Sequence, residues 1–359
     1  GTKNGHESQS SRIKADNPDD ITSMFNSYFA SVFDSDDSLR EETSHDLETP
    51  VLSEIILTVE EVQAVLETLD VTKATGPDNV PARLLKETAP VISTSLCTLF
   101  NKSLSQGALP EDWKIANIIP VYKKGEKEYA ENYRPISLLS IVSKVLERCV
   151  FYNIREQLYQ VIKTSQHGFT RGKSCVTNLL EVLNYIGSIL DVGGQVDAVY
   201  LDMSKAFDKV NHKHLLHKLR MAGFGGSLLQ WFQSYLTNRH QRVTAQGSTS
   251  TTLPVTSGVP QGSILGPVLF SLYVNDLPDT VTSSHVAMFA DDTKLFKNIN
   301  SLLKCHIMPG ISSNPMKFPL LMVTTSGSDC RGLKSYSVHE PRRQLRRTRT
   351  LKQFQQMTI

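Results

Sequence analysis

Apolar residues recur at regular spacing along most of the chain, and the period alternates between that of a helix and that of a strand. Residues 19–33 have helical spacing, with Asp19 or Asp20 as the expected N-cap. Thr58 and Glu61 have the spacing of a capping box at the start of a second helix. Helical spacing predicts further helices over residues 82–107 with an interruption at Pro90, 139–159, 211–223, 227–238 and 263–277.

Short apolar or alternating runs predict strands between these helices. They cover residues 115–122, 196–202, 240–247 paired with 251–258, and 285–290 paired with 293–297. Strands and helices mixed in this way indicate an α/β or α+β layer with helices on one face of a sheet. The periodicity fades after Lys297, residues 1–17 are polar and expected to be disordered, and residues 34–48 form an acidic linker.

Three aspartates stand where predicted strands end. Asp291 and Asp292 follow "HVAMFA" at the tip of a hairpin, and Asp202 ends "VDAVYLD". A turn explains the Asp pair taken alone, because Asp bonds to nearby backbone and tolerates unusual dihedrals. However, two strands that deliver carboxylates to the same end of a sheet can share divalent metal ions, an arrangement that suits phosphoryl transfer. Together the two segments favour a Mg²⁺ site, since Mg²⁺ prefers oxygen ligands.

Two further segments have the composition of phosphate-binding sites. "TSGVPQGSILGP", residues 256–267, is a glycine-rich loop that opens a helix, although a plain strand-to-helix turn has the same appearance. Residues 120–139 carry Lys123, Lys124, Lys127 and Arg134 after a strand. These cations can hold a triphosphate or a nucleic-acid backbone, and a solvated charged loop is the alternative.

Composition sets the broad class of the protein. The 359 residues are 40% hydrophobic and 21% charged, with a formal net charge of +2, so any binding of nucleic acid must come from local basic clusters. The five cysteines are scattered without a Cys-x-x-Cys pair, which argues against a disulfide framework or a zinc finger. No signal peptide or bilayer-spanning run is visible, so we expect an intracellular protein that is not secreted, in the cytoplasm, the nucleus or both.

Five segments occur in an order that resembles the motifs of a reverse transcriptase. They are "NYRPISLLSIVSKVLE", "QHGFTRGKSC", "YLDMSKAFDKV", "SGVPQGSILGPVLFSLYVNDL" and "FADDTK". Their spelling resembles that of non-long-terminal-repeat (LINE-type) retrotransposons of the jockey and chicken-repeat kind, over about residues 55–297. The resemblance implies a right-hand polymerase with fingers and an antiparallel palm sheet backed by helices. It implies an RNA template, a DNA primer and deoxynucleoside triphosphates as partners, and no membrane.

The resemblance also implies which residues hold metal. Asp202, Asp291 and Asp292 would be the catalytic carboxylates and metal ligands, with the backbone carbonyl of Met203 completing the shell. The implied cofactor is a pair of Mg²⁺ ions, for which Mn²⁺ is the expected substitute.

A second set of residues is implied to bind the nucleotide. Phe207 would pack under the sugar and exclude a 2′-OH; the alternative is a core aromatic, and one side chain can fill both roles. Gln261 and Gly262 would contact the incoming nucleotide and the template base pair. Lys123 and Arg134 would grip the triphosphate from the fingers.

The domain organisation expected from these motifs has four parts. They are a polar segment with one helix over residues 1–50, an N-terminal extension and fingers over 51–195, a palm over 196–300, and a divergent basic tail over 301–359. That tail does not read as the thumb that such enzymes carry next, which indicates a C-terminally truncated or aberrant form.

Three functions follow from this reading. The first is an RNA-directed DNA polymerase that transfers nucleotides to a primer 3′-OH with two Mg²⁺ ions. The second is a catalytically inactive retroelement remnant that at most binds RNA. The third is a maturase-like splicing protein, which would need a basic domain after the thumb that the sequence does not show.

Two weaker signals carry no assignment. His212, His214 and His217 lie close together, but their spacing does not put all three on one helical face, so a metal site is not predicted. The run from Arg342 to Arg349 suits either nucleic-acid binding, a nuclear import signal or a solvated tail.

Overall fold

The computed structural model describes residues 17–34, 52–299 and 335–338, and these divide into two compact units. The first unit comprises described residues up to Ile162 together with Lys205–Val274, and the second comprises Lys163–Ser204 and described residues from Asn275 onward. The predictions for residues 1–16, the acidic linker and the basic run near the C-terminus concern parts of the chain outside the described residues.

The first unit contains a mixed sheet and a set of helices. Its helices are α1 (Pro18–Ser31), α2 (Val59–Glu67), α3 (Ala82–Glu87), α4 (Ala89–Ser105), α5 (Ile141–Val161), α7 (His212–Met221), α8 (Gly226–Leu236) and α9 (Gly266–Tyr273). Its strands are β1 (Ile115–Tyr122), β2 (Tyr133–Leu138), β4 (Arg239–Ala245), β5 (Ser248–Thr249) and β6 (Leu253–Val255). The strand order is β2-β1-β4-β5, with β6 also paired to β4. The β1–β4 pair is parallel and the others are antiparallel.

Local signals explain how several of these helices begin. The predicted capping box of α2 is confirmed: Thr58 Oγ1 accepts from the Glu61 backbone N–H at 3.2 Å, and Glu61 Oε2 accepts from the Thr58 N–H at 2.8 Å. The predicted break near Pro90 is confirmed at Thr88, between α3 and α4. The predicted N-cap of α1 is wrong. Asn17 caps that helix, because its Oδ1 accepts from the Asp20 N–H at 2.8 Å and Pro18 takes the first helical position.

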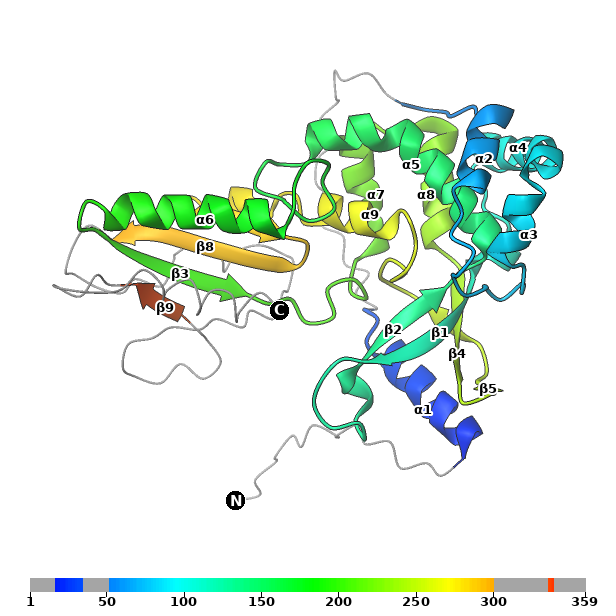
Figure 1. The fold of residues 1–359 in the computed structure, drawn as a ribbon, viewed down its shortest axis with the longest axis horizontal. Coiled ribbons are helices and arrows are strands. Elements are labelled where there is room, and N and C mark those ends of the chain that lie inside the picture. The colour runs from blue at the N-terminus through cyan, green and yellow to red at the C-terminus, as the bar shows by residue number, and fades with distance from the viewer. Residues whose placement is uncertain (1–16, 35–51, 300–334, 339–359) are drawn as a thin grey trace. The chain divides into compact units, whose positions relative to one another are not determined.

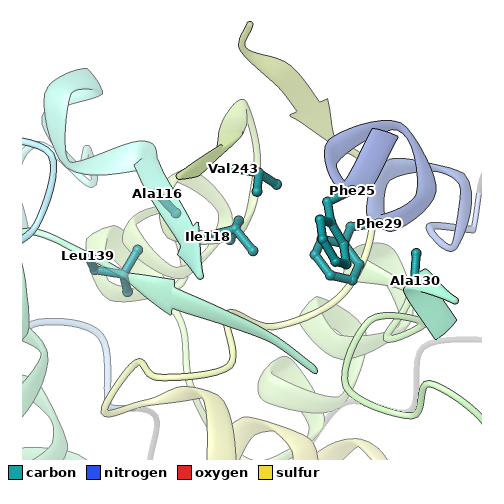
Figure 2. Packing of buried hydrophobic residues seen from close by; sticks show 7 residues of the cluster. All are labelled: Phe25, Phe29, Ala116, Ile118, Ala130, Leu139 and Val243. Carbon is teal, nitrogen blue, oxygen red and sulfur yellow. The ribbon is translucent and has the colours of Figure 1, made fainter. Parts of the chain in front are cut away.

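The core of the first unit places α1 against the mixed sheet. Figure 2 shows Phe25 and Phe29 from α1 facing Ile118 of β1 and Val243 of β4. These side chains are at most 5% exposed, so the helix is an integral part of this core.

The second unit is an antiparallel sheet covered by one helix. The strand order is β7-β8-β3-β9, formed by β7 (His285–Phe289), β8 (Asp292–Ile299), β3 (Gln195–Leu201) and β9 (Ser335–Val338). Helix α6 (Cys175–Leu190) runs along the sheet (Figure 1). Val182, Ile186 and Ile189 of α6 pack against Val196 and Phe296 of the sheet. The predicted hairpin over residues 285–297 is confirmed.

The architecture is therefore mixed α/β, as predicted. None of the described helices has the length and apolar content that a bilayer crossing needs.

Candidate functional site

The strand register of the second unit brings the three predicted carboxylates to one end of its sheet. Leu201, the last residue of β3, pairs with Thr293 of β8, so Asp202 comes next to the start of β8. Asp292 is the first residue of β8 and pairs with Phe289 of β7, which leaves Asp291 in the turn between the strands. Residues opposite each other in an antiparallel pair have Cα atoms about 5 Å apart. The Asp202 and Asp292 side chains are exposed and that of Asp291 is half-buried.

The turn of this hairpin has an unusual backbone. Ala290 and Asp291 are the two residues between the paired positions Phe289 and Asp292, and Ala290 has a φ of 56°. Two-residue hairpin turns need positive φ, which usually selects Gly, Asn or Asp. Met203, whose carbonyl was predicted to join the site, is a buried residue just beyond Asp202.

The chemistry of this edge fits a divalent cation. Mg²⁺ is commonly held by one or two protein carboxylates and completes its shell with water and substrate phosphates. Asp202 and Asp291 carry carboxylate oxygens, which are donors of that kind. Within the described ranges, no group of three or more His, Cys, Asp or Glu side chains is arranged to hold a metal ion.

The predicted nucleotide-binding residues belong to the first unit, where two loops are joined by hydrogen bonds. The N–H groups of Gly258 and Val259 donate to the carbonyls of Val210 and Phe207 at 2.8 and 2.9 Å. Gly258 has a φ of 89°, and a Cβ there would lie 2.8 Å from the Phe207 carbonyl oxygen. Only glycine therefore allows this approach. His212 Nε2 donates to the Gly258 carbonyl at 2.8 Å, which gives one of the three clustered histidines a structural role.

Gln261 and Gly262 are tied to both neighbouring segments. Gln261 Nε2 donates to Asp208 Oδ1 at 3.0 Å, and the Gln261 carbonyl accepts from the Ser137 N–H at 2.8 Å. Gly262 has a φ of 124°, and a Cβ there would lie 2.7 Å from the Ser137 carbonyl oxygen. Ser137, Asp208 and Gln261 line one pocket together with Lys205.

Asp208 has perturbed acidity. Burial raises the pKa of its carboxyl to about 6, while the hydrogen bond from Gln261 and the Lys205 ammonium lower that pKa by less. Phe207, its neighbour, is half-buried and stacks on Phe270 with ring centroids 4.4 Å apart. The Phe207 ring is thus supported on one face, and its role beneath a sugar stays a prediction.

Glu147 of α5 holds the end of the glycine-rich loop. Its Oε2 accepts from the Ile264 and Leu265 N–H groups at 2.8 and 3.2 Å, and from the Tyr235 hydroxyl at 3.2 Å. The residue is fully buried, and this burial raises the pKa of the carboxyl although Arg239 opposes the effect. Glu147 therefore fixes the loop where it enters α9.

Lys123 and Arg134 lie together at the loop end of the β1–β2 hairpin. Val121 pairs with Arg134, and the Lys123 N–H donates to the Asn132 carbonyl at 2.8 Å. Lys123 follows Val121, the residue opposite Arg134, by two positions. Side chains two positions apart point to the same face, so Lys123 and Arg134 lie on the same face of the hairpin. Both side chains are exposed.

The predicted residues thus form two groups in different units: the carboxylates in the second, and the nucleotide-binding candidates in the first. Asp208, Glu147, Ser137 and Gln166 take part in fixing these segments, and we assigned them no role from sequence. All four stand inside the reverse-transcriptase motifs given above, which was the available signal.

Comparison with known proteins identifies the family of the chain. Residues 121–308 match the family described as reverse transcriptase (RNA-dependent DNA polymerase). The chain is 32% identical over 273 residues to a probable RNA-directed DNA polymerase from transposon BS of Drosophila melanogaster, covering 72% of this chain and 30% of that protein. It is 30% identical over 280 residues to the RNA-directed DNA polymerase from mobile element jockey of the same species, covering 74% and 30%.

A probable RNA-directed DNA polymerase from transposon X-element of Drosophila melanogaster is 34% identical over 65% of this chain and 26% of that protein. The chain thus spans under a third of the length of these relatives. The resemblance to polymerases of non-long-terminal-repeat retrotransposons is confirmed, and the chain belongs to the reverse transcriptase family of RNA-directed DNA polymerases, which are nucleotidyltransferases.

Proposed function

We propose that this chain is the polymerase part of a retrotransposon reverse transcriptase and adds deoxynucleotides to a primer 3′-OH on an RNA template. The observation that carries the proposal is the register of β3 against β8, which brings Asp202 to the same sheet end as the Asp291–Asp292 turn. The second unit is then the catalytic part of the palm.

Asp202 and Asp291 would hold divalent metal, with Asp292 and the Met203 carbonyl as further ligands. Reverse transcriptases use divalent metal ions, and we propose a pair of Mg²⁺ ions replaceable by Mn²⁺. When bound, such ions lower the pKa of an attacking hydroxyl and stabilise a leaving pyrophosphate. The carboxylates orient the reacting groups because they sit on the ends of hydrogen-bonded strands.

The residues of the first unit would bind the incoming deoxynucleoside triphosphate. Lys123 and Arg134, exposed on one face of a hairpin, suit a triphosphate. Phe207 offers a supported ring that excludes a 2′-OH. Gln261 would present its side chain to the nucleotide from an orientation held by Asp208.

Primer extension on an RNA template with deoxynucleotides and Mg²⁺ tests the proposal. We expect extension by the native chain and a loss of at least about 100-fold in Asp202→Ala and Asp291→Asn, because each removes a group that acts on the reacting atoms. Asp197→Asn, on the same strand β3 but away from its acidic end, is the matched control and should retain activity.

Equal extension by Asp291→Asn and native protein would show that the site is assigned wrongly. A folded native chain that binds RNA but extends no primer would instead support the inactive remnant.

A further inference from the structure

Gln166 lies in the loop between α5 and α6 and reaches the turn that carries Asp291. Its side chain is 2% exposed. Gln166 Oε1 accepts from the Ala290 N–H at 2.9 Å and from the Gly168 N–H at 2.8 Å, and its Nε2 lies 3.4 Å from the Ala290 carbonyl. The side-chain amide of Gln166 therefore contacts both the N–H and the carbonyl of Ala290, the residue immediately before Asp291.

The backbone around Gln166 is fixed to the same hairpin. The Met288 N–H donates to the Ser165 carbonyl and the Met288 carbonyl accepts from the His167 N–H, each at 2.8 Å. A Cβ on Gly168 would lie 2.3 Å from the Ala290 nitrogen, so this glycine permits close approach. Gln166 and Met288 form an isolated parallel β-bridge, so the loop pairs with β7.

The loop is also anchored to the helix that covers the sheet. His167 Nδ1 and Nε2 lie 2.9 Å from Thr177 Oγ1 and 2.8 Å from Glu181 Oε2, both on α6. The loop that contacts the turn is therefore also bonded to α6, the helix that packs in the core of the second unit.

Ala290 needs this support because its positive φ is unfavourable for a residue with a Cβ. Hydrogen bonds to both of its peptide groups stabilise that conformation against a relaxed turn. Any relaxation would displace Asp291, which follows directly in the chain.

We propose that Gln166 is a positioning residue that fixes the Ala290–Asp291 turn and thereby places the Asp291 carboxylate for catalysis. This inference rests on the proposed function, since it takes Asp291 as a catalytic group.

The test compares native protein with Gln166→Met, which keeps the size of the side chain and removes its polar atoms. We expect kcat to fall about 10- to 100-fold, the KM for deoxynucleotide to stay within about threefold, and the Mg²⁺ concentration at half-maximal rate to rise at least about threefold. Gln241→Met is the matched control. Gln241 is a buried glutamine (3% exposed) whose Nε2 donates to Asn26 Oδ1 in the first unit, and its replacement should leave the Mg²⁺ requirement unchanged.

Hydrogen exchange of the peptide covering residues 285–296 provides a readout besides activity. Gln166→Met should accelerate its exchange at least about tenfold, and Gln241→Met should not. If Gln166→Met does not fold, Gln166→Glu serves in its place, because a carboxylate still accepts from both N–H groups but cannot donate to the Ala290 carbonyl. We expect Gln166→Glu to change kcat, the Mg²⁺ requirement and the hydrogen exchange in the same directions as Gln166→Met, but by smaller factors.

Unchanged hairpin exchange in the Gln166 variant, or faster exchange with kcat and the Mg²⁺ requirement unaltered, would overturn the inference. Absence of extension by the native chain would instead defeat the proposed function. In that case the hydrogen-exchange result alone decides whether Gln166 fixes the turn.

Discussion

Asp208 illustrates how one buried side chain makes stability depend on pH. Its pKa is about 6 in the folded chain and 3.8 for an ordinary aspartate, so between these values the folded state binds more protons than the unfolded state. The free energy of unfolding should therefore decrease as the pH rises from about 4 to about 6, and this contribution should then stay constant. Asp208→Asn removes the titration but keeps an oxygen that accepts from Gln261.

Relative to native protein, Asp208→Asn should gain roughly 2–3 kcal/mol of stability between pH 4 and pH 7, measured by urea unfolding. Asp112→Asn, the same change of charge at an exposed aspartate of the same unit, provides the comparison. A stability difference for Asp208→Asn that is independent of pH would show that this carboxyl has an ordinary pKa in the folded chain.

Phe207 is the residue on which sugar selection should depend. Its ring is supported by Phe270, so truncation opens space beside the sugar while leaving the loop hydrogen bonds at the Phe207 carbonyl in place. Phe207→Ala should raise incorporation of ribonucleotides relative to deoxynucleotides by roughly 10- to 100-fold.

Competition between the two nucleotides in primer extension measures this ratio. Phe270→Leu, which alters the support and not the ring itself, should change the ratio far less. Equal discrimination by Phe207→Ala and native protein would leave Phe207 as a packing residue.

At the scale of elements, the end of the loop that enters α9 is held by a carboxylate from another helix, that of Glu147. Glu147→Leu leaves the Ile264 and Leu265 N–H groups and the Tyr235 hydroxyl without this acceptor. We expect a loss of about 2–4 kcal/mol in urea unfolding, because buried polar groups without partners are costly. Glu147→Gln keeps an acceptor oxygen and should lose less. Equal losses for Leu and Gln would show that shape, not the acceptor, matters at this position.

Elements with strong local signals were predictable, and those that depend on partners were not. The capping box at Thr58 and the apolar strands at β3 and β7 follow from short stretches of sequence. Strand β2 was missed because Pro135 removes a backbone donor. It is tolerated because β2 is an edge strand whose Pro135 pairs with Pro120.

Helix α6 is absent from the predicted elements, although Ser174 and Thr177 form a capping box at its start. The hairpin predicted over residues 240–258 has its turn at Gln246–Gly247 and pairs β4 with β5 and then β6, so the second strand is interrupted.

The residues of the candidate site also divide into those with a local sequence signal and those that depend on distant partners. The aspartates are predictable because Asp202 and the Asp291–Asp292 pair each follow an apolar run, a pattern within one segment. Gln166 lies about 120 residues before Ala290 in the chain, and no spacing rule predicts its hydrogen bonds. Likewise, the pairing of Asp208 with Gln261 depends on how two loops fold together.

At the scale of the whole molecule, the division into two units predicts separable unfolding. Both tryptophans, Trp113 and Trp231, lie in the first unit, so their fluorescence reports on that unit alone. Ile186→Ala opens a cavity in the core of the second unit and should cost about 2–4 kcal/mol there. In this variant, we expect the unfolding transition measured by circular dichroism to change, while the unfolding midpoint measured by tryptophan fluorescence stays the same.

Leu139→Ala, in the core of the first unit, is the matched control and should move the fluorescence midpoint. If each variant shifts both signals equally, the two units unfold as one and the prediction is wrong.

The interleaving of the two units also determines the order in which the chain can fold during synthesis. Strand β3 leaves the ribosome about 90 residues before its neighbour β8, because residues 205–274 of the other unit come between them. At usual rates of translation that interval is about 5–20 s. Throughout it, the apolar β3 lacks both of its sheet neighbours, β8 and β9, so the nascent chain presents uncovered strand edges to chaperones and to neighbouring nascent chains.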